Sequence, residues 1–240
     1  MWQDYDASYR GALQDSAFLA WRELGARKKA ENIVRVCQEI KPVSLVEIGC
    51  GTGAVLRMLH AMNFAQEYYC IDVSFSAVRF VLNSCPDFAP RALVGSADAL
   101  PFPDGAFSVA VLSHVLEHLD DPVSALRETS RIARFVVVEV PTEKVLSNVV
   151  RTKVLFRPYA SQADAGHVQF WSPASIAKFL TQDAGMEILN RRLDLLGEEI
   201  DAGRNTPHTK SLVKRTLKSA LPASIYSRLL TTHAVFLCRR

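Results

Sequence analysis

The sequence lacks several features that would place it in particular protein classes. It has no apolar run of the roughly 18 residues that a membrane-spanning helix requires. Its first residues, 1–6, contain neither a basic start nor an apolar stretch, so we expect no signal peptide. The five cysteines are an odd number, and none forms a Cys-x-x-Cys pair or a Cys/His cluster at metal-ligating spacing. These absences predict a cytoplasmic protein with reduced thiols, no membrane span and no metal site.

Negative charge is missing from the C-terminal part of the chain. The net charge is only +3, but from Arg204 to the end there are eight Lys or Arg residues and no Asp or Glu. A basic segment of this kind suits an anionic partner, such as a phosphorylated small molecule or an anionic membrane surface. A solvated basic helix is the alternative. Aromatic and basic residues do not alternate in the segment 204–240, so we expect no nucleic-acid partner.

A group of glycines between a predicted strand and a predicted helix is the most informative stretch that the sequence does contain. The apolar run 44–48 ends in Gly49, Gly51 and Gly53, and apolar residues at helical spacing follow in 54–60. Glycines let a ligand approach the backbone, and the start of a helix offers unpaired N–H groups. The spacing also fits the loose pattern of dinucleotide-binding loops, and an ordinary glycine-rich turn is the simplest alternative.

Strands and helices alternate along the chain from this loop to residue 141. Five strands are predicted, at 44–48, 67–72, 91–96, 107–112 and 135–140. The first, fourth and fifth are almost entirely apolar, which is typical of a parallel sheet covered on both faces. Two further strands are predicted at 186–196 and 232–238, and two separate helices, around 17–21 and at 30–40, are predicted before the first strand.

Two acidic residues follow predicted strands and suit the recognition of a nucleoside. Asp72 ends the second strand, 19 residues after Gly53, where a carboxylate can accept hydrogen bonds from ribose hydroxyls. Asp98 lies just beyond the third strand. An acid at a strand end without any binding role is the alternative for either residue.

Taken in order, these motifs resemble those of the class I S-adenosylmethionine-dependent methyltransferases of the type 11 group. The resemblance is specific over residues 44–141 and weaker over 166–186. It rests on Glu47-Ile48-Gly49-Cys50-Gly51-Thr52-Gly53, Ile71-Asp72-Val73-Ser74, Ala97-Asp98-Ala99-Leu100-Pro101-Phe102, His114-Val115-Leu116-Glu117-His118 and Gly166-His167. It implies a Rossmann-like α/β fold with helices on both faces of a seven-stranded, mostly parallel sheet. The last strand would be antiparallel, and the cofactor would be S-adenosyl-L-methionine.

The resemblance also implies which residues hold this cofactor. Glu47 is expected to face the methionine ammonium, Asp72 the ribose hydroxyls and Asp98 the adenine amine. Asp98 argues against a nicotinamide dinucleotide, because it fits an adenosine that lies across the strand ends without a pyrophosphate. The full set of expected cofactor-binding residues is Glu47, Gly49, Cys50, Gly51, Gly53, Asp72, Val73, Asp98, Ala99 and Ser113.

Two histidines are the candidates for catalysis. Methyl transfer from a sulfonium needs a general base only when the acceptor must lose a proton. His114 and His167 could provide that base, although a structural role is the alternative for each. The expected acceptor is a small molecule, with an anionic, sugar-linked or lipid-linked one suggested by the basic segment. A nicotinamide-dependent oxidoreductase and a catalytically silent cofactor-binding protein are the two alternative functions.

No linker divides the chain, so we expect a single domain over 1–240. Residues 1–43 would form an N-terminal helical cap, and residues 44–141 the cofactor-binding core. Residues 142–166 and 197–231 have little periodicity and would be insertions that shape the substrate site.

Overall fold

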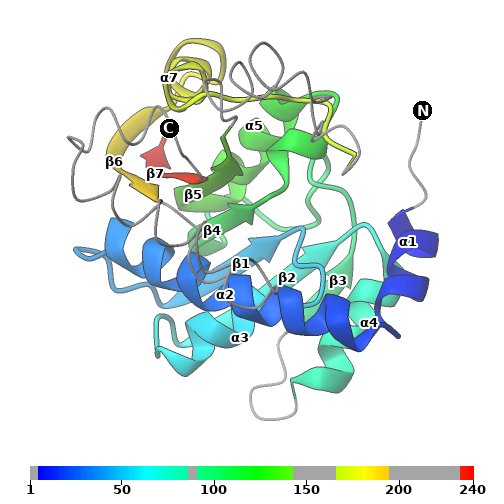
Figure 1. Ribbon diagram of the computed structural model, residues 1–240. Helices are drawn as coiled ribbons and strands as arrows, with labels where there is room; N and C mark the ends of the chain where they lie inside the picture. Colours follow the sequence, from blue (N-terminus) through cyan, green and yellow to red (C-terminus); the bar gives the residue numbers. More distant parts are fainter. Residues whose placement is uncertain (1–4, 86–90, 143–165, 195–232) are drawn as a thin grey trace, which may run out of the picture.

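Seven strands form one sheet in the computed structural model, which describes residues 5–85, 91–142, 166–194 and 233–240 (Figure 1). The strand order is β3-β2-β1-β4-β5-β7-β6. The strands are β1 (Ser44–Ile48), β2 (Glu67–Asp72), β3 (Arg91–Val94), β4 (Phe107–Ser113), β5 (Ala133–Pro141), β6 (Glu187–Asp194) and β7 (His233–Arg239). β7 runs antiparallel to both of its neighbours, and the pairings among β1 to β5 are parallel. The predicted fold class is therefore confirmed.

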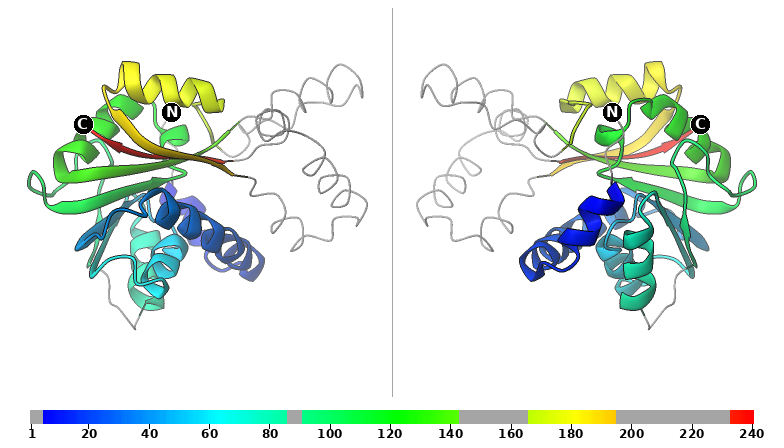
Figure 2. Two further views of the ribbon diagram at one scale, coloured as in Figure 1. Left: turned by 90° about the vertical axis from the view of Figure 1, so that its left-hand side faces the viewer. Right: turned by 90° about the vertical axis from the view of Figure 1, so that its right-hand side faces the viewer.

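Helices cover both faces of this sheet, so that the molecule has three layers (Figure 2). The described helices are α1 (Tyr5–Ala12), α2 (Ser16–Val36), α3 (Ala54–Ala61), α4 (Phe75–Ser84), η1 (Leu116–His118), α5 (Pro122–Ile132), α7 (Pro173–Lys178) and η3 (Phe179–Asp183). One face packs against α2, α3 and α4, and the other packs against α5, α7 and η3. Within the described residues, no helix is long and apolar enough to cross a bilayer.

Successive side chains of a strand point to opposite faces of the sheet, and in the central strands the side chains on both faces are apolar and buried. In β4, Val109 and Val111 belong to the core beneath α2 and α3, whereas Ala110 and Leu112 belong to the core beneath α5 and α7. All four side chains are completely buried. Since each buried aliphatic side chain contributes about 1.5–3 kcal/mol, the uninterrupted apolar strands stabilise the two layers at once. The five cysteines are also buried, and none is in a disulfide.

The N-terminal helices differ from the prediction. The two predicted helices are wrong, because a single helix of 21 residues, α2, runs from Ser16 to Val36. The carboxylate of Asp15 caps its start by accepting from the backbone N–H of Ala17. Gly25 interrupts the helical pattern in the sequence but is buried in the middle of α2. The missing side chain costs helix stability of about 1 kcal/mol, and it leaves open the cavity that Gly25 helps to line.

The glycine loop after β1 depends on Gly49 for a reason that can be tested. Gly49 has a φ of 71°, and a Cβ built on it would lie 2.5 Å from Cγ2 of Val115. We expect Gly49→Ala to lower the free energy of unfolding by about 2–3 kcal/mol, because of this overlap and the left-handed backbone. Urea denaturation of the variant would measure the loss.

A double-mutant cycle separates the two causes. In a Val115→Ala background the overlap is relieved, so the cost of Gly49→Ala should fall by about 1 kcal/mol and leave only the backbone strain. Additive effects of the two substitutions would contradict the proposed contact.

Candidate active site

A cavity of about 260 Å³ lies at the ends of the central strands. Four of its lining residues, Glu47, Gly49, Cys50 and Thr52, come from β1 and the loop that follows it. Two more, Ser113 and His114, come from the end of β4 and the residue after it. Because β1 and β4 are adjacent and parallel, their carboxyl ends meet at the same edge, where ligands of open α/β sheets bind. Helix α2 contributes five lining residues: Trp21, Arg22, Gly25, Ala26 and Lys29. The lining also includes Pro141, His167 and His233.

Asp72 connects the glycine loop to the second strand. Its Oδ2 atom accepts from the N–H of Gly51 at 2.8 Å, and its Oδ1 atom accepts from the N–H of Ser74 at 2.9 Å. Burial raises the pKa of Asp72, while these backbone bonds and nearby Arg22 lower it. A carboxylate has about four acceptor positions, so both oxygens can still accept from ribose hydroxyls.

Glu47 is a buried carboxylate with an unused oxygen. Its side chain is only 2% exposed, and its Oε2 atom has no hydrogen-bond partner. Burial raises the pKa of Glu47 to about 8, although Lys29 and Arg22 oppose that rise. A buried, unsatisfied carboxylate costs stability unless a cation pairs with it. The cavity therefore fits a ligand that brings an ammonium group to Glu47, as the methionine part of S-adenosylmethionine does.

Helices α1 and α2 cover the glycine loop with Tyr9, Arg22 and Lys29, none of which is among the predicted site residues. Arg22 donates to the hydroxyl oxygen of Tyr9 at 3.1 Å. A Cβ on Gly51 would lie 2.5 Å from that oxygen and 2.8 Å from a guanidinium nitrogen of Arg22. Arg22 and Lys29 are seven residues apart, which places them on one face of α2. The spacing of these two cations was the only feature of the sequence that could have indicated their place at the site.

Helix α1 is held in place through Asp6. Its Oδ1 atom accepts from the hydroxyl of Ser74 at 3.0 Å and from the N–H of Ser76 at 2.7 Å. Both partners lie at the start of α4, directly after Asp72. The N-terminal helices therefore lie over the loop that the resemblance assigns to the cofactor.

His114 has a strained backbone at the end of β4. Its φ is 60°, which is rare for a residue other than glycine, and such strain is common at functional sites. Its Nδ1 atom lies 3.2 Å from Oε1 of Glu117, and its buried Nε2 atom has no hydrogen-bond partner. Burial is the main reason that the pKa of His114 lies well below the usual value. The imidazole is therefore neutral and can accept a proton.

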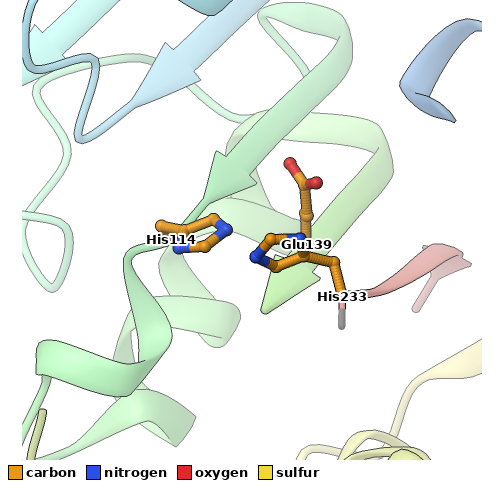
Figure 3. A group of neighbouring side chains, drawn as sticks. All are labelled: His114, Glu139 and His233. Atoms are coloured by element: carbon orange, nitrogen blue, oxygen red, sulfur yellow. The ribbon is translucent and has the colours of Figure 1, made fainter. Parts of the chain in front are cut away.

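His233 and Glu139 lie beside His114. Figure 3 shows the two imidazole rings next to each other, with Glu139 on β5, and the ring centroids are 4.6 Å apart. The hydroxyl of Ser113 donates to Oε2 of Glu139 at 2.6 Å. The acidic side chain with the strongest influence on Lys29 is Glu139. His233 was not predicted as a site residue, because only the tertiary pairing of β7 with β5 brings it to this edge.

His167, the second predicted catalytic histidine, is brought to the cavity by backbone contacts. The N–H groups of Val168 and Gln169 donate to the carbonyl of Glu117 at 2.8 and 3.0 Å. The ring of His167 then lies edge-to-face against that of His118, with centroids 4.8 Å apart. Residues some 50 positions apart in sequence thus meet at one end of the cavity.

Six of the ten predicted cofactor-binding residues do not line the cavity, namely Gly51, Gly53, Asp72, Val73, Asp98 and Ala99. Val73 and Asp98 are exposed side chains. The N–H of Ala99, which the resemblance places near the adenine ring, donates to the carbonyl of Ser96 at 3.3 Å. The cavity is lined by Glu47, Gly49, Cys50 and Ser113 of the predicted set, and the cofactor contacts of all ten residues remain predictions.

The sheet order and the reversed last strand are those of the class I methyltransferase fold, which the solved structures described below share. A family model described as a methyltransferase domain matches residues 46–135. Over these residues the chain is similar to methyltransferase domains, whose methyl donor is S-adenosyl-L-methionine.

Two characterised relatives support the same assignment. The chain is 32% identical over 100 residues to the ajmaline N-methyltransferase of Rauvolfia serpentina, a match covering 40% of this chain and 34% of that protein. It is 25% identical over 173 residues to the demethylmenaquinone methyltransferase of Thermotoga maritima, covering 68% of this chain and 74% of the relative. The chain therefore spans only about a third of the first relative and about three quarters of the second.

Solved structures show the same fold at low sequence identity. The [4+2]-cyclase SpnF has a TM-score of 0.60 and 19% identity, covering 89% of this chain and 81% of that one. The magnesium protoporphyrin IX methyltransferase of Synechocystis, solved with bound SAH, has a TM-score of 0.58 and 14% identity, covering 90% and 84%. At these identities the likeness concerns the fold alone.

Proposed function

We propose that this protein transfers the methyl group of S-adenosylmethionine to a small-molecule acceptor that enters the cavity from the side of His114 and His167. The observation that carries the proposal is the cavity itself, which joins the glycine loop and the unsatisfied carboxylate of Glu47 to a buried, neutral histidine. The glycine loop and Glu47 suit the methyl donor, and the neutral histidine suits an acceptor that must lose a proton.

Three charged side chains would hold the cofactor. Glu47 would pair with the methionine ammonium, Arg22 with the methionine carboxylate, and Asp72 with the ribose hydroxyls. Arg22 suits the carboxylate because its guanidinium already lies against Gly51 at the mouth of the glycine loop. The bound cofactor supplies an electrophilic methyl group on a sulfonium, so the protein mainly has to position the acceptor.

His114 is our proposed general base. Its neutral ring lines the cavity, and contact with Glu117 on one side and His233 on the other fixes its orientation. The unpartnered Nε2 atom would take the proton from the acceptor. His167 is the other candidate from the sequence, and it lines the same cavity.

The acceptor would be bound in part by the two predicted insertions. Pro141, His167 and His233 line the cavity, and they lie next to residues 143–165 and 195–232, which are outside the described residues. The basic segment that suggested an anionic, sugar-linked or lipid-linked acceptor also falls mainly outside them. We propose that these insertions select the acceptor, within a single domain over 1–240.

Calorimetric titration followed by an activity screen would test the proposed function. We expect S-adenosylmethionine to bind and NAD not to bind, and we expect radiolabelled methyl transfer to at least one member of a panel of neutral, phosphorylated and lipid-linked acceptors. His114→Gln should lower kcat at least about 100-fold for an acceptor that loses a proton, with little change in cofactor affinity. Binding of NAD instead of the methyl donor would contradict the proposal, and donor binding without any transfer would favour a silent binding protein.

A further inference from the structure

A second group of polar side chains, Glu117, His118 and His167, borders the cavity beside the proposed base His114. The potential ligand atoms of Glu117, His118 and His167 all lie within 4.8 Å of one another. Glu117 is completely buried, its Oε2 atom has no hydrogen-bond partner, and its Oε1 atom has only Nδ1 of His114 nearby, at 3.2 Å. Such a carboxylate is costly to bury without a cation, so its environment points to a charged ligand.

The two histidines are arranged as metal ligands are. The Nδ1 atom of His118 lies 3.1 Å from the carbonyl oxygen of Gly166. A carbonyl can only accept, so Nδ1 carries the hydrogen and Nε2 keeps its lone pair free. Metal-binding histidines commonly donate their other ring N–H to a carbonyl in this way. The buried Nδ1 atom of His167 has no hydrogen-bond partner.

The backbone already brings the two ends of this group together. The N–H groups of Val168 and Gln169 both donate to the carbonyl of Glu117, which fixes the segment after Gly166 against η1. Ligand atoms around one four-coordinate ion lie about 3.4 Å apart at bond lengths of ~2.1 Å. Side-chain rotations that move the ligand atoms by about an ångström would therefore close the group around an ion.

The charges in this group favour a divalent cation. Glu117 supplies a carboxylate and the two histidines supply imidazole nitrogens, and divalent transition-metal ions bind this combination of ligands. Lys29 also lies close enough to influence Glu117, but Glu139 has the larger effect on Lys29.

The neighbouring group of His114, Glu139 and His233 (Figure 3) also brings potential ligand atoms within 4.8 Å. It is less suited to an ion, because Ser113 already donates to Glu139 and Lys29 already supplies positive charge there.

We propose that Glu117, His118 and His167 bind one divalent transition-metal ion at the acceptor end of the cavity. Two imidazoles and one carboxylate suit ions such as Zn²⁺, Co²⁺ or Mn²⁺, and three protein ligands leave coordination positions open.

The open positions would define the acceptor class, and this part of the inference rests on the proposed methyltransferase function. An acceptor hydroxyl would coordinate through its oxygen and lose its proton to His114 or to solvent. That oxygen would then form the new O–CH₃ bond as the S–CH₃ bond of the donor breaks, leaving S-adenosylhomocysteine. The acceptor would accordingly be an oxygen nucleophile whose acidity the metal increases.

Metal titration without any methyl donor tests the site by itself. After treatment with EDTA and its removal, we expect one Zn²⁺ or Co²⁺ per chain by calorimetry, with Mg²⁺ binding much more weakly. Glu117→Gln, His118→Gln and His167→Gln should each weaken binding at least tenfold, and the visible absorption of bound Co²⁺ should decrease. His60→Gln, on α3 and away from the cavity, is the matched control and should bind as the unaltered protein does.

Thermal unfolding shows whether a variant has merely lost its fold. Added Zn²⁺ should raise the Tm of the unaltered protein by several degrees and leave that of Glu117→Gln unchanged. Cooperative unfolding of the variants together with unaltered metal affinity would overturn the site. Metal binding combined with methyl transfer that is insensitive to EDTA would keep the site and overturn the assignment of the acceptor, whereas metal binding without donor binding would count only against the proposed function.

Discussion

Replacing Asp72 by alanine should weaken the binding of S-adenosylmethionine about 100-fold. The buried carboxylate at the end of β2 would accept two hydrogen bonds from the ribose, and hydrogen bonds to a charged group contribute about 1.5–3 kcal/mol each. A combined loss of about 3 kcal/mol corresponds to a factor of roughly 100 in Kd. Calorimetric titration with the methyl donor and with S-adenosylhomocysteine would measure it.

The same carboxylate also holds the glycine loop, so the test needs a milder variant. Asp72→Asn retains the shape and one oxygen to accept from Gly51 or Ser74, and we expect it to weaken both ligands about tenfold while leaving the fold intact. Asp104→Asn provides the control, because its exposed carboxylate pairs with Arg131 far from the cavity. Unchanged affinity in both Asp72 variants would contradict a role in ribose binding.

Replacing Glu47 by glutamine should remove most of the affinity for the methionine end of the cofactor and change its pH dependence. In the free protein, burial raises the pKa of Glu47 to about 8, although the nearby cations Lys29 and Arg22 act in the opposite direction. Glu47 is then largely protonated at pH 6.5, and pairing with an ammonium must release that proton. The affinity of the unaltered protein should therefore increase as the pH rises from 6 toward 8, with about one proton released per cofactor at pH 6.5.

Calorimetry in two buffers with different ionisation enthalpies would measure the proton release. Glu47→Gln should release almost none, and at pH 8 it should bind S-adenosylmethionine about 10–100-fold more weakly. The internal control is 5′-methylthioadenosine, which has the nucleoside but no methionine ammonium or carboxylate. Its affinity should stay within about twofold in Glu47→Gln and decrease in Asp72→Asn. Equal losses for both ligands would show that Glu47 acts on the fold of the site instead of on the ammonium.

The sheet could be predicted closely because its strands are apolar and clearly bounded. The start of β1 at Ser44, its end at Ile48 and the end of β2 at Asp72 all agree with the prediction, since Pro42 and Gly49 bound β1 and the charged Asp72 ends the apolar pattern of β2. The N-terminal helices were harder, because Gly25 resembles a helix break when only local propensity is considered. Packing of α2 against α3 outweighs that local cost.

The site was predicted unevenly for a similar reason. Glu47, Gly49 and Cys50 are neighbours in sequence, so one motif identified all three. Arg22 and Lys29 belong to no motif. Any helix that packs over the loop could present two cationic side chains to it, so their spacing alone does not mark a site. The grouping of Glu117, His118 and His167 depends on the backbone hydrogen bonds between Glu117 and the segment after Gly166. Such contacts between distant segments leave no local pattern of spacing.

The sequence by itself determined the sheet, the glycine loop and the class of the cofactor, because these depend on hydrophobic alternation and on residues close together in one motif. Only the tertiary structure decided that α2 lies over the loop with Arg22 and Lys29, and that His114 and His233 lie side by side. Both arrangements result from packing and strand pairing between segments far apart in the chain. The glycine-loop side of the cavity was therefore predictable from local sequence, whereas the sides formed by α2 and by the histidines depend on the fold.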